Sequence, residues 1–345
     1  MNGSPVPRAA ILGCAGLSLD ADESALFRDA DPLGFILFAR NCAEPAQVRD
    51  LVASLRATVG RADAPILIDQ EGGRVARLKP PHWRAAPAAA RLGAIAARDP
   101  ERAARASFLN ARLIARELAD LGIDVDCAPV LDLGLRETHQ VIGDRAFAAE
   151  PEIVARLGRA FCDGLLAGAV MPVIKHIPGH GRARADSHLE LPTVETDRAT
   201  LVATDFAPFI ALNKAPWAMT AHVRYGALDA ENAATLSRRI LGDIVRGAIG
   251  FEGVLVSDDL GMKALEGNFG ARAAAALAAG CDLVLHCSGD RAEMASVIAA
   301  TPRLRPESAA RLARAAAIRR AAVQNAAPFD PESARAELDA LLGPS

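Results

Sequence analysis

The chain has 345 residues, of which 51% are hydrophobic and 23% charged, and this composition excludes an intrinsically disordered protein. The formal net charge of −3 excludes a surface built to bind duplex nucleic acid, and an aromatic content of 4% provides few platforms for base stacking. No run of about 18 apolar residues occurs, so we expect no membrane span.

Six cysteines are scattered along the chain, and none forms a C-x-x-C pair. Most lie in apolar stretches, where a reduced cysteine behaves as a small hydrophobic residue. The first residues do not show the pattern of a secretory signal peptide. We therefore expect a soluble cytoplasmic protein.

Eight short apolar runs recur along the chain, each of a length suited to a β-strand. Their nearly continuous apolar character is typical of parallel strands that are covered on both faces. They span residues 10–14, 34–38, 65–69, 123–128, 170–175, 217–221, 253–257 and 282–286.

Amphipathic segments with helical periodicity separate these runs. The clearest span residues 45–59, 102–121, 151–167, 197–212, 237–248, 269–279 and 291–299, with two more at 306–324 and 331–342. Eight strand–helix repeats predict an α/β fold, a (β/α)8 TIM-like barrel, with extra C-terminal helices. An open doubly wound sheet is the alternative, because a sequence pattern does not reveal closure. We expect one domain over residues 1–345, with the barrel at about 8–300 and the C-terminal helices at about 303–343.

Polar residues gather where the predicted strands end. In a barrel, these positions meet at one face, where the loops after the strands build the active site. Some have ordinary structural explanations: Asp259 suits a helix N-cap, and His286 suits a buried core histidine. The set comprises Asp69, Glu71, Arg74, Asp132, Arg145, Lys175, His176, His180, Asp186, His188, His222, Arg224, Asp258, Asp259 and His286.

The segment after the fifth predicted strand is the richest in chemical groups. It reads Lys-His-Ile-Pro-Gly-His-Gly over residues 175–181 and continues to Asp186-Ser187-His188. An aspartate near a histidine can fix its tautomer and raise its pKa, which would make His188 an acid or base near neutrality. A solvated flexible loop and a metal site built from His176, His180 and His188 are the alternatives.

These residues are similar to a known family. The chain resembles the bacterial β-N-acetylglucosaminidases of glycoside hydrolase family 3, specifically the short, single-domain, peptidoglycan-recycling type. The matching motifs are IDQEGGRVAR (68–77), APVLD (128–132), IGDRAF (142–147), KHIPGHG (175–181) with DSH (186–188), MTAH (219–222) and SDDLGM (257–262).

The resemblance implies a retaining enzyme that releases N-acetylglucosamine from muropeptides. It implies that Asp258 is the nucleophile and that Asp186 with His188 forms the acid/base dyad. It assigns sugar binding to Asp69, Arg77, Arg145, Lys175 and His176. We expect no cofactor and no metal, a monomer, and no nucleic-acid or membrane partner. A metal-dependent barrel hydrolase, a saccharide-binding barrel and transfer to phosphate instead of water are the alternatives.

Overall fold

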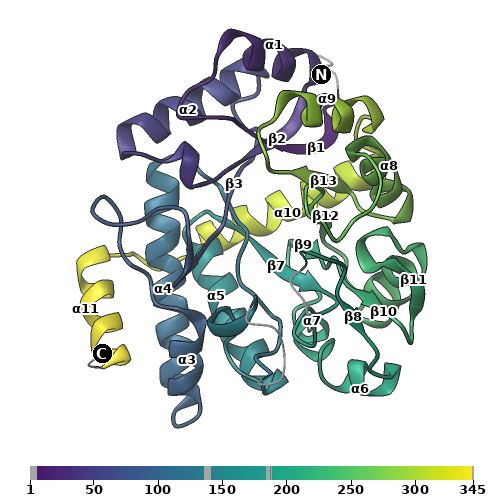
Figure 1. Cartoon of the computed structure of the whole chain (residues 1–345). Helices are drawn as coiled ribbons and strands as arrows, with labels where there is room; N and C mark the ends of the chain where they lie inside the picture. The colour runs from purple at the N-terminus through teal and green to yellow at the C-terminus, as the bar shows by residue number, and fades with distance from the viewer. Residues whose placement is uncertain (1–5, 136–140, 184–186, 188, 344–345) are drawn as a thin grey trace.

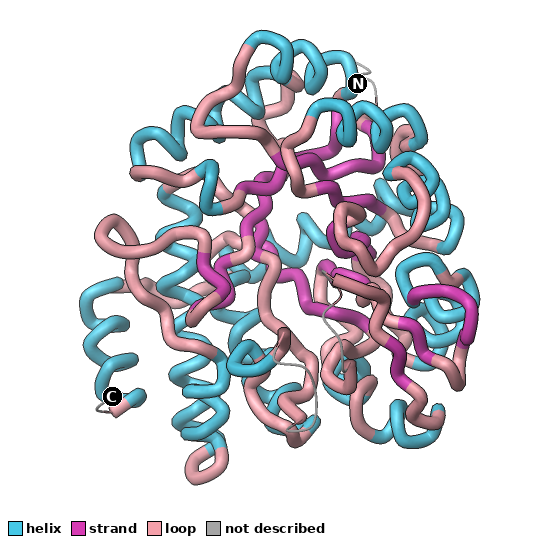
Figure 2. The backbone as a smooth tube through the Cα atoms, in the orientation of Figure 1, coloured by secondary structure: helices cyan, strands magenta, loops and turns pink. Residues whose placement is uncertain are grey.

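The computed structural model describes residues 6–135, 141–183, 187 and 189–343, and within these ranges eight parallel strands close into a barrel. The strands follow one another around the barrel in chain order, and the last pairs with the first, with Ile11 opposite Leu285. Figure 2 shows them at the centre with the helices outside. Closure confirms the barrel over the open sheet. The strands are β1 (Arg8–Gly13), β2 (Pro32–Leu37), β3 (Ile66–Ile68), β6 (Val125–Asp126), β7 (Met171–Ile177), β9 (Trp217–Thr220), β12 (Val254–Asp259) and β13 (Leu283–His286).

Helices surround the barrel (Figure 1) and begin where sequence signals predict. Asp20, Asp99, Asn268 and Asp290 each accept a backbone N–H at a helix start, and proline occupies the first turn of α2, α4 and α5. In the described part of the chain, no helix is long and apolar enough to cross a bilayer. The helices are α1 (Ala21–Ala30), α2 (Pro45–Thr58), α3 (Ala89–Ala96), α4 (Pro100–Asp120), α5 (Pro151–Ala167), α6 (Arg198–Ala203), α7 (Ala207–Ala211), the π-helix η4 (Ile240–Ala248), α8 (Phe269–Ala279) and α9 (Arg291–Ala300).

Two C-terminal helices, α10 (Pro306–Gln324) and α11 (Pro331–Leu342), have the predicted bounds. Arg319 and Arg311 of α10 pair with Asp124 and Asp282, which precede β6 and β13. Helix α10 therefore lies at the end of the barrel where the strands begin, and the opposite end is left to the loops that follow them. Helix α11 packs against α4 (Figure 1).

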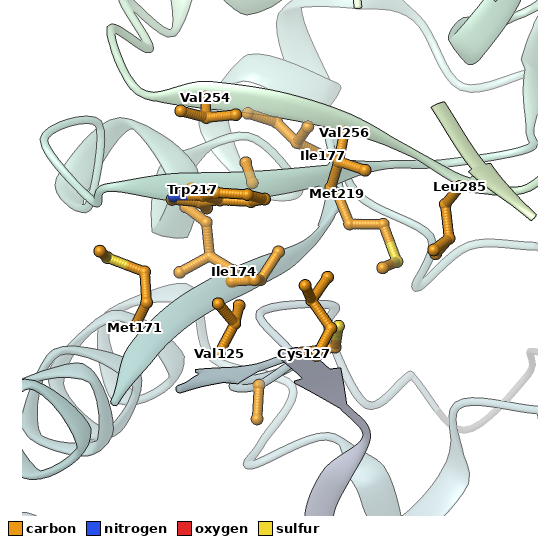
Figure 3. Packing of buried hydrophobic residues seen from close by; sticks show 14 of the residues in the cluster. Val125, Cys127, Met171, Ile174, Ile177, Trp217, Met219, Val254, Val256 and Leu285 are labelled. Carbon is orange, nitrogen blue, oxygen red and sulfur yellow. The ribbon is translucent and has the colours of Figure 1, made fainter. Parts of the chain in front are cut away.

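The barrel core is made of interlocking apolar side chains from neighbouring strands. Figure 3 shows Val125, Ile174, Trp217, Val256 and Leu285, which come from five different strands, in one packed cluster. Close packing of this kind holds the strand ends in fixed positions. All six cysteines are free thiols, as predicted, and five of them are buried.

The structure differs from the predicted elements in the middle of the chain. The helix predicted over 197–212 is two short helices, α6 and α7, because Pro208 has no N–H to continue a helix through residue 204. The helix predicted over 237–248 is helical but wide, with π-type bonding in η4. Two small sheets were not predicted: β4 (Gln70–Gly72) with β5 (Val75–Ala76), and β8 (Thr193–Val194) with β10 (Arg224–Tyr225) and β11 (Asp229–Ala233).

Candidate active site

A cavity of about 480 Å³ opens at the end of the barrel where the strands finish. This volume lies in the range of small-molecule sites and suits a single sugar ring. All five residues predicted to bind sugar line it, together with Asp258. Its charged and polar lining includes Asp69, Glu71, Arg74, Arg77, Arg145, Lys175, His176, His180, Ser187, Asp258 and Asp259.

Asp69, directly after β3, is held between two cations. Lys175 Nζ lies 2.8 Å from its Oδ1, and an Arg77 Nη lies 3.0 Å from its Oδ2. Burial opposes ionisation of this carboxyl, but the two cations hold its pKa well below its usual range. Asp69 is therefore ionised and fixed in orientation at neutral pH.

Glu71 forms a second ion-paired centre beside the first. Its two oxygens accept from Arg145 at 2.9 and 2.8 Å, and Lys175 Nζ lies 2.7 Å from one of them. Burial opposes ionisation, yet Lys175 and Arg145 lower the pKa of Glu71 to about 2. Lys175 thus bridges two carboxylates. Burial opposes the charge on Lys175, but the neighbouring Asp69 and Glu71 carboxylates raise its pKa.

The β4–β5 hairpin returns Arg77 to Asp69. The Gln70 side chain accepts from the backbone N–H groups of Arg77 and Leu78, at 2.9 and 3.0 Å, and donates to the Leu78 carbonyl. At the turn, Gly72 and Gly73 have φ of 99° and 57°, a conformation that favours glycine. This arrangement explains why glutamine stands between Asp69 and Glu71.

His176 is oriented by Asp132. Its Nδ1 lies 2.6 Å from Asp132 Oδ2, and the other carboxylate oxygen accepts the backbone N–H groups of His176 and His180. Burial opposes ionisation of Asp132, but the two histidines lower its pKa. A carboxylate only accepts, so the proton on His176 is placed on Nδ1.

His180 supports the loop that follows β7. Its Nε2 lies 3.3 Å from Ser187 Oγ, and its side chain is buried. Burial lowers the pKa of His180 to about 4, so the ring is neutral at pH 7. These contacts indicate a bracing role.

Asp258 lies at a bulge in β12. Val256 pairs with Leu283 but Asp259 pairs with Leu285, so the strand gains one residue at this point. A bulge of this kind redirects a side chain, and here the Asp258 carboxylate lines the cavity. Although burial opposes ionisation, the imidazoles of His176 and His222 and the Asp259 N–H, 2.8 Å from Oδ1, lower its pKa. The group is an ionised carboxylate with little solvent around it.

The predicted acid/base residues Asp186 and His188 lie outside the described residues. Ser187, between them in sequence, is described and lines the cavity. Its carbonyl accepts the N–H of Ala264, in the turn after Asp258, at 3.2 Å. Ser187, which stands between the two predicted dyad residues in the sequence, therefore contacts the turn that follows β12.

The other strand-end residues have structural contacts. His222 bridges Thr235 Oγ1 at 2.7 Å and the Asp259 carbonyl at 3.0 Å. His286 lies 3.2 Å from Glu293. Asp259 accepts from Gly261 and Cys287 instead of capping a helix, so the N-cap explanation is wrong.

Sequence reasoning missed two contributors to the cavity. Glu71 was quoted within a motif but given no role, although Asp69 and Glu71 are two positions apart, a spacing that places side chains on one side of extended backbone. Phe38, after β2, gives the cavity an aromatic wall, with the Arg77 guanidinium carbon 5.0 Å from its ring centre. Among the residues that the structure describes, no group of three or more His, Cys, Asp or Glu side chains is arranged to hold a metal ion.

Comparisons with known proteins show the family to which the chain belongs. The "Glycosyl hydrolase family 3 N terminal domain" matches residues 14–319. A β-hexosaminidase of Alkalilimnicola ehrlichii is 42% identical over 88% of this chain and 87% of its own length, and one from Pseudomonas aeruginosa is 40% identical over 88% and 89%. The crystal structure of native NagZ from Neisseria gonorrhoeae has a TM-score of 0.85 at 33% identity, and the match covers 98% of this chain and 99% of that one. The chain therefore belongs to glycoside hydrolase family 3, and it is a β-N-acetylhexosaminidase, a hydrolase of β-linked N-acetylglucosamine.

Proposed function

We propose that the protein is an exo-acting, retaining β-N-acetylglucosaminidase in which Asp258 is the nucleophile. The observation that carries this proposal is the ionised Asp258 carboxylate, which lines a cavity of the size of one sugar. In the proposed reaction, this carboxylate attacks the anomeric carbon and forms a covalent glycosyl-aspartate as the leaving oxygen departs. Water then releases the sugar.

The proton transfers are assigned to His188, oriented by Asp186. His188 protonates the leaving oxygen in the first step and accepts a proton from water in the second. A histidine then replaces the carboxylic acid that most glycosidases use, and Asp186 raises its pKa toward the working pH.

The sugar itself is held by Asp69, Arg77, Arg145, Lys175 and His176. Ion pairing fixes Asp69 between two cations, so its oxygens are already oriented to accept from sugar hydroxyls before the substrate arrives. Preorganisation of this kind reduces the entropy cost of binding.

The proposed natural substrate is a muropeptide in which N-acetylglucosamine is linked to 1,6-anhydro-N-acetylmuramic acid. It would be consumed during peptidoglycan recycling in the cytoplasm by a monomer with a single domain. A solved relative from Neisseria gonorrhoeae was crystallised with N-trifluoroacetyl-D-glucosamine, which supports an amino sugar in the cavity. Product analysis in phosphate buffer separates hydrolysis, which gives free N-acetylglucosamine, from transfer to phosphate.

Covalent trapping tests the nucleophile. A 5-fluoro N-acetylglucosaminyl donor forms its glycosyl-enzyme faster than the intermediate hydrolyses, so mass spectrometry of digested protein should find the label on Asp258. Asp259→Asn, in the adjacent position, should still be labelled, whereas Asp258→Asn should be neither labelled nor active. A label on another residue, or turnover by Asp258→Asn, contradicts the assignment.

The dependence of the hydrolysis rate on the leaving group tests the acid role of His188. His188→Ala should slow hydrolysis of the natural disaccharide far more than hydrolysis of a nitrophenyl glycoside, because a good leaving group needs no proton. Steady-state kcat/KM on both substrates measures the difference. Equal losses on the two substrates would remove His188 from the acid role.

A further inference from the structure

Glu71 contacts two of the five cavity residues proposed to bind sugar, yet no role in the reaction has been given to it. It joins Arg145, in the short helix η2 (Gly143–Arg145), to Lys175 of β7. The three side chains are 7%, 11% and 2% exposed, respectively. Ion pairs at this depth are weakly screened by solvent, so their geometry is closely constrained.

The contact between Glu71 and Arg145 is bidentate. Arg145 donates from Nε to Oε2 and from Nη2 to Oε1, the parallel arrangement that fixes the plane of both groups. Its Nη1 also donates to the Val141 carbonyl at 3.1 Å. With the described residues, these contacts use three of the five N–H groups of the guanidinium, which leaves two for a ligand.

Lys175 contacts two carboxylates. One of its ammonium hydrogens serves Asp69 and another serves Glu71, with Nζ–O distances of 2.8 and 2.7 Å. One hydrogen is left for a ligand. Among the described residues, Glu71 is the carboxylate that pairs with Arg145, and it is one of the two that pair with Lys175.

We infer that Glu71 is a positioning residue that aims Arg145 and Lys175 at the bound sugar. The inference rests on the sugar-binding role proposed for Arg145. Glu71 acts through these cations, because its two oxygens already carry three contacts with them. Asp69 contacts one cation at each oxygen, so each oxygen can still accept from a sugar hydroxyl, and Asp69 is assigned direct contact with the sugar.

A double-mutant cycle tests the inference. Glu71→Gln keeps the side-chain size but removes the charge, and should raise KM for a nitrophenyl N-acetylglucosaminide by about 10- to 100-fold with little change in kcat. Arg145→Ala should have a similar effect. The double variant should lose less than the product of the two single losses, because without the guanidinium Glu71 can act only through Lys175.

Rescue by guanidinium ion gives a readout that a purely structural role would not move. Added guanidinium should restore part of the affinity of Arg145→Ala, because the Glu71 carboxylate can hold it in the vacant position. It should not restore the Glu71→Gln/Arg145→Ala variant. If Glu71→Gln fails to fold, Glu71→Asp, which withdraws the carboxylate by one methylene, takes its place in the same measurements.

Asp144→Asn is the matched control. It removes a carboxylate next to Arg145 in sequence, which pairs with Arg74 in a half-exposed contact. Pairs of this kind contribute little, so KM should stay unchanged.

The outcomes separate the two claims. If Arg145→Ala binds substrate normally, the proposed sugar-binding role of Arg145 is wrong. If Arg145→Ala is impaired but Glu71→Gln adds a full independent loss, or guanidinium rescues both backgrounds equally, the positioning role of Glu71 is wrong.

Discussion

Buried carboxyl groups near the active end of the barrel differ in charge because their neighbours differ. Asp69 and Glu71 each contact two cations and stay ionised despite burial. Asp126 of β6 has no such contact: its Oδ1 accepts the Gln70 N–H at 2.9 Å, and its Oδ2 has no hydrogen-bond partner among the described residues. Burial, helped by the nearby anions, raises the pKa of Asp126 to about 8. The fold therefore holds a neutral carboxylic acid beside a charged site.

This charge state predicts an unusual pH dependence of stability. The unfolded chain loses the Asp126 proton near pH 4, whereas the folded protein keeps it up to about pH 8. Between these two pH values the unfolded state binds fewer protons than the folded state, so the contribution of Asp126 to the free energy of unfolding falls as pH rises. Asp126→Asn should remove this loss of stability. When the free energy of unfolding is measured with urea at pH 5, 6.5 and 8, its slope against pH should be less negative in the variant than in the wild type, by up to about 1.4 kcal/mol per pH unit.

Asp229→Asn is the control for this comparison. Although burial opposes ionisation, hydrogen bonds from Ser237 and from the backbone N–H groups of Glu231 and Asn232 lower the pKa of Asp229, so its titration lies below the tested pH range and its replacement should leave the slope between pH 5 and 8 unchanged. Parallel profiles for wild type and Asp126→Asn would show that Asp126 is ionised in the folded protein.

The eight barrel strands could be predicted because each lies in a short, largely buried and mostly apolar run between helical segments. Helix starts at Pro151 and Pro306 could be predicted because proline fits only the first turn. The β4–β5 hairpin could not, since its strands have only three and two residues, too few to show a periodic pattern. The pairing of Glu71 with Arg145 spans 74 positions in sequence, a separation that no local pattern reveals.

The small sheet of β8, β10 and β11 supports the loop after β7. Tyr225 of β10 is fully buried and donates its hydroxyl to the Gly179 carbonyl, in the loop that continues to Asp186 and His188. Its ring packs 6.5 Å from that of Phe206. This sheet therefore contacts the loop that follows β7 although it lies outside the barrel.

Removing this hydroxyl should weaken both folding and catalysis. Tyr225→Phe leaves the Gly179 carbonyl unpaired in a buried place, which costs about 1–3 kcal/mol in the free energy of unfolding. We expect kcat to fall more for the natural disaccharide than for a nitrophenyl glycoside, because only the former needs a well-placed acid. Arg224→Ala changes the residue next to Tyr225 in β10 and loses a contact to Thr193 of β8, and it should show no such preference. An equal preference in both variants would contradict the link to the loop.

The two ends of the barrel differ in what covers them. The loops that follow the strands supply the charged cavity, whereas α10 lies at the other end, with its arginines on Asp124 and Asp282. Helix α11 lies on the flank, against α4, and buries Ala334 and Leu338. Residues 326–343 contribute no side chain to the cavity.

Deleting residues 326–345 should therefore separate stability from activity. The deletion exposes the surface of α4 that Leu338 covers and removes Phe329, whose ring lies 4.2 Å from the Arg112 guanidinium carbon. We expect the free energy of unfolding to fall by about 2–5 kcal/mol, with kcat/KM at low temperature unchanged. Glu337→Gln, which breaks only the half-exposed pair with Arg105, should cost less than about 1 kcal/mol. A deletion variant that stays folded but loses activity would show that α11 is coupled to the cavity, and the path would run through α3, which contacts both α11 and the helix η2 that carries Arg145.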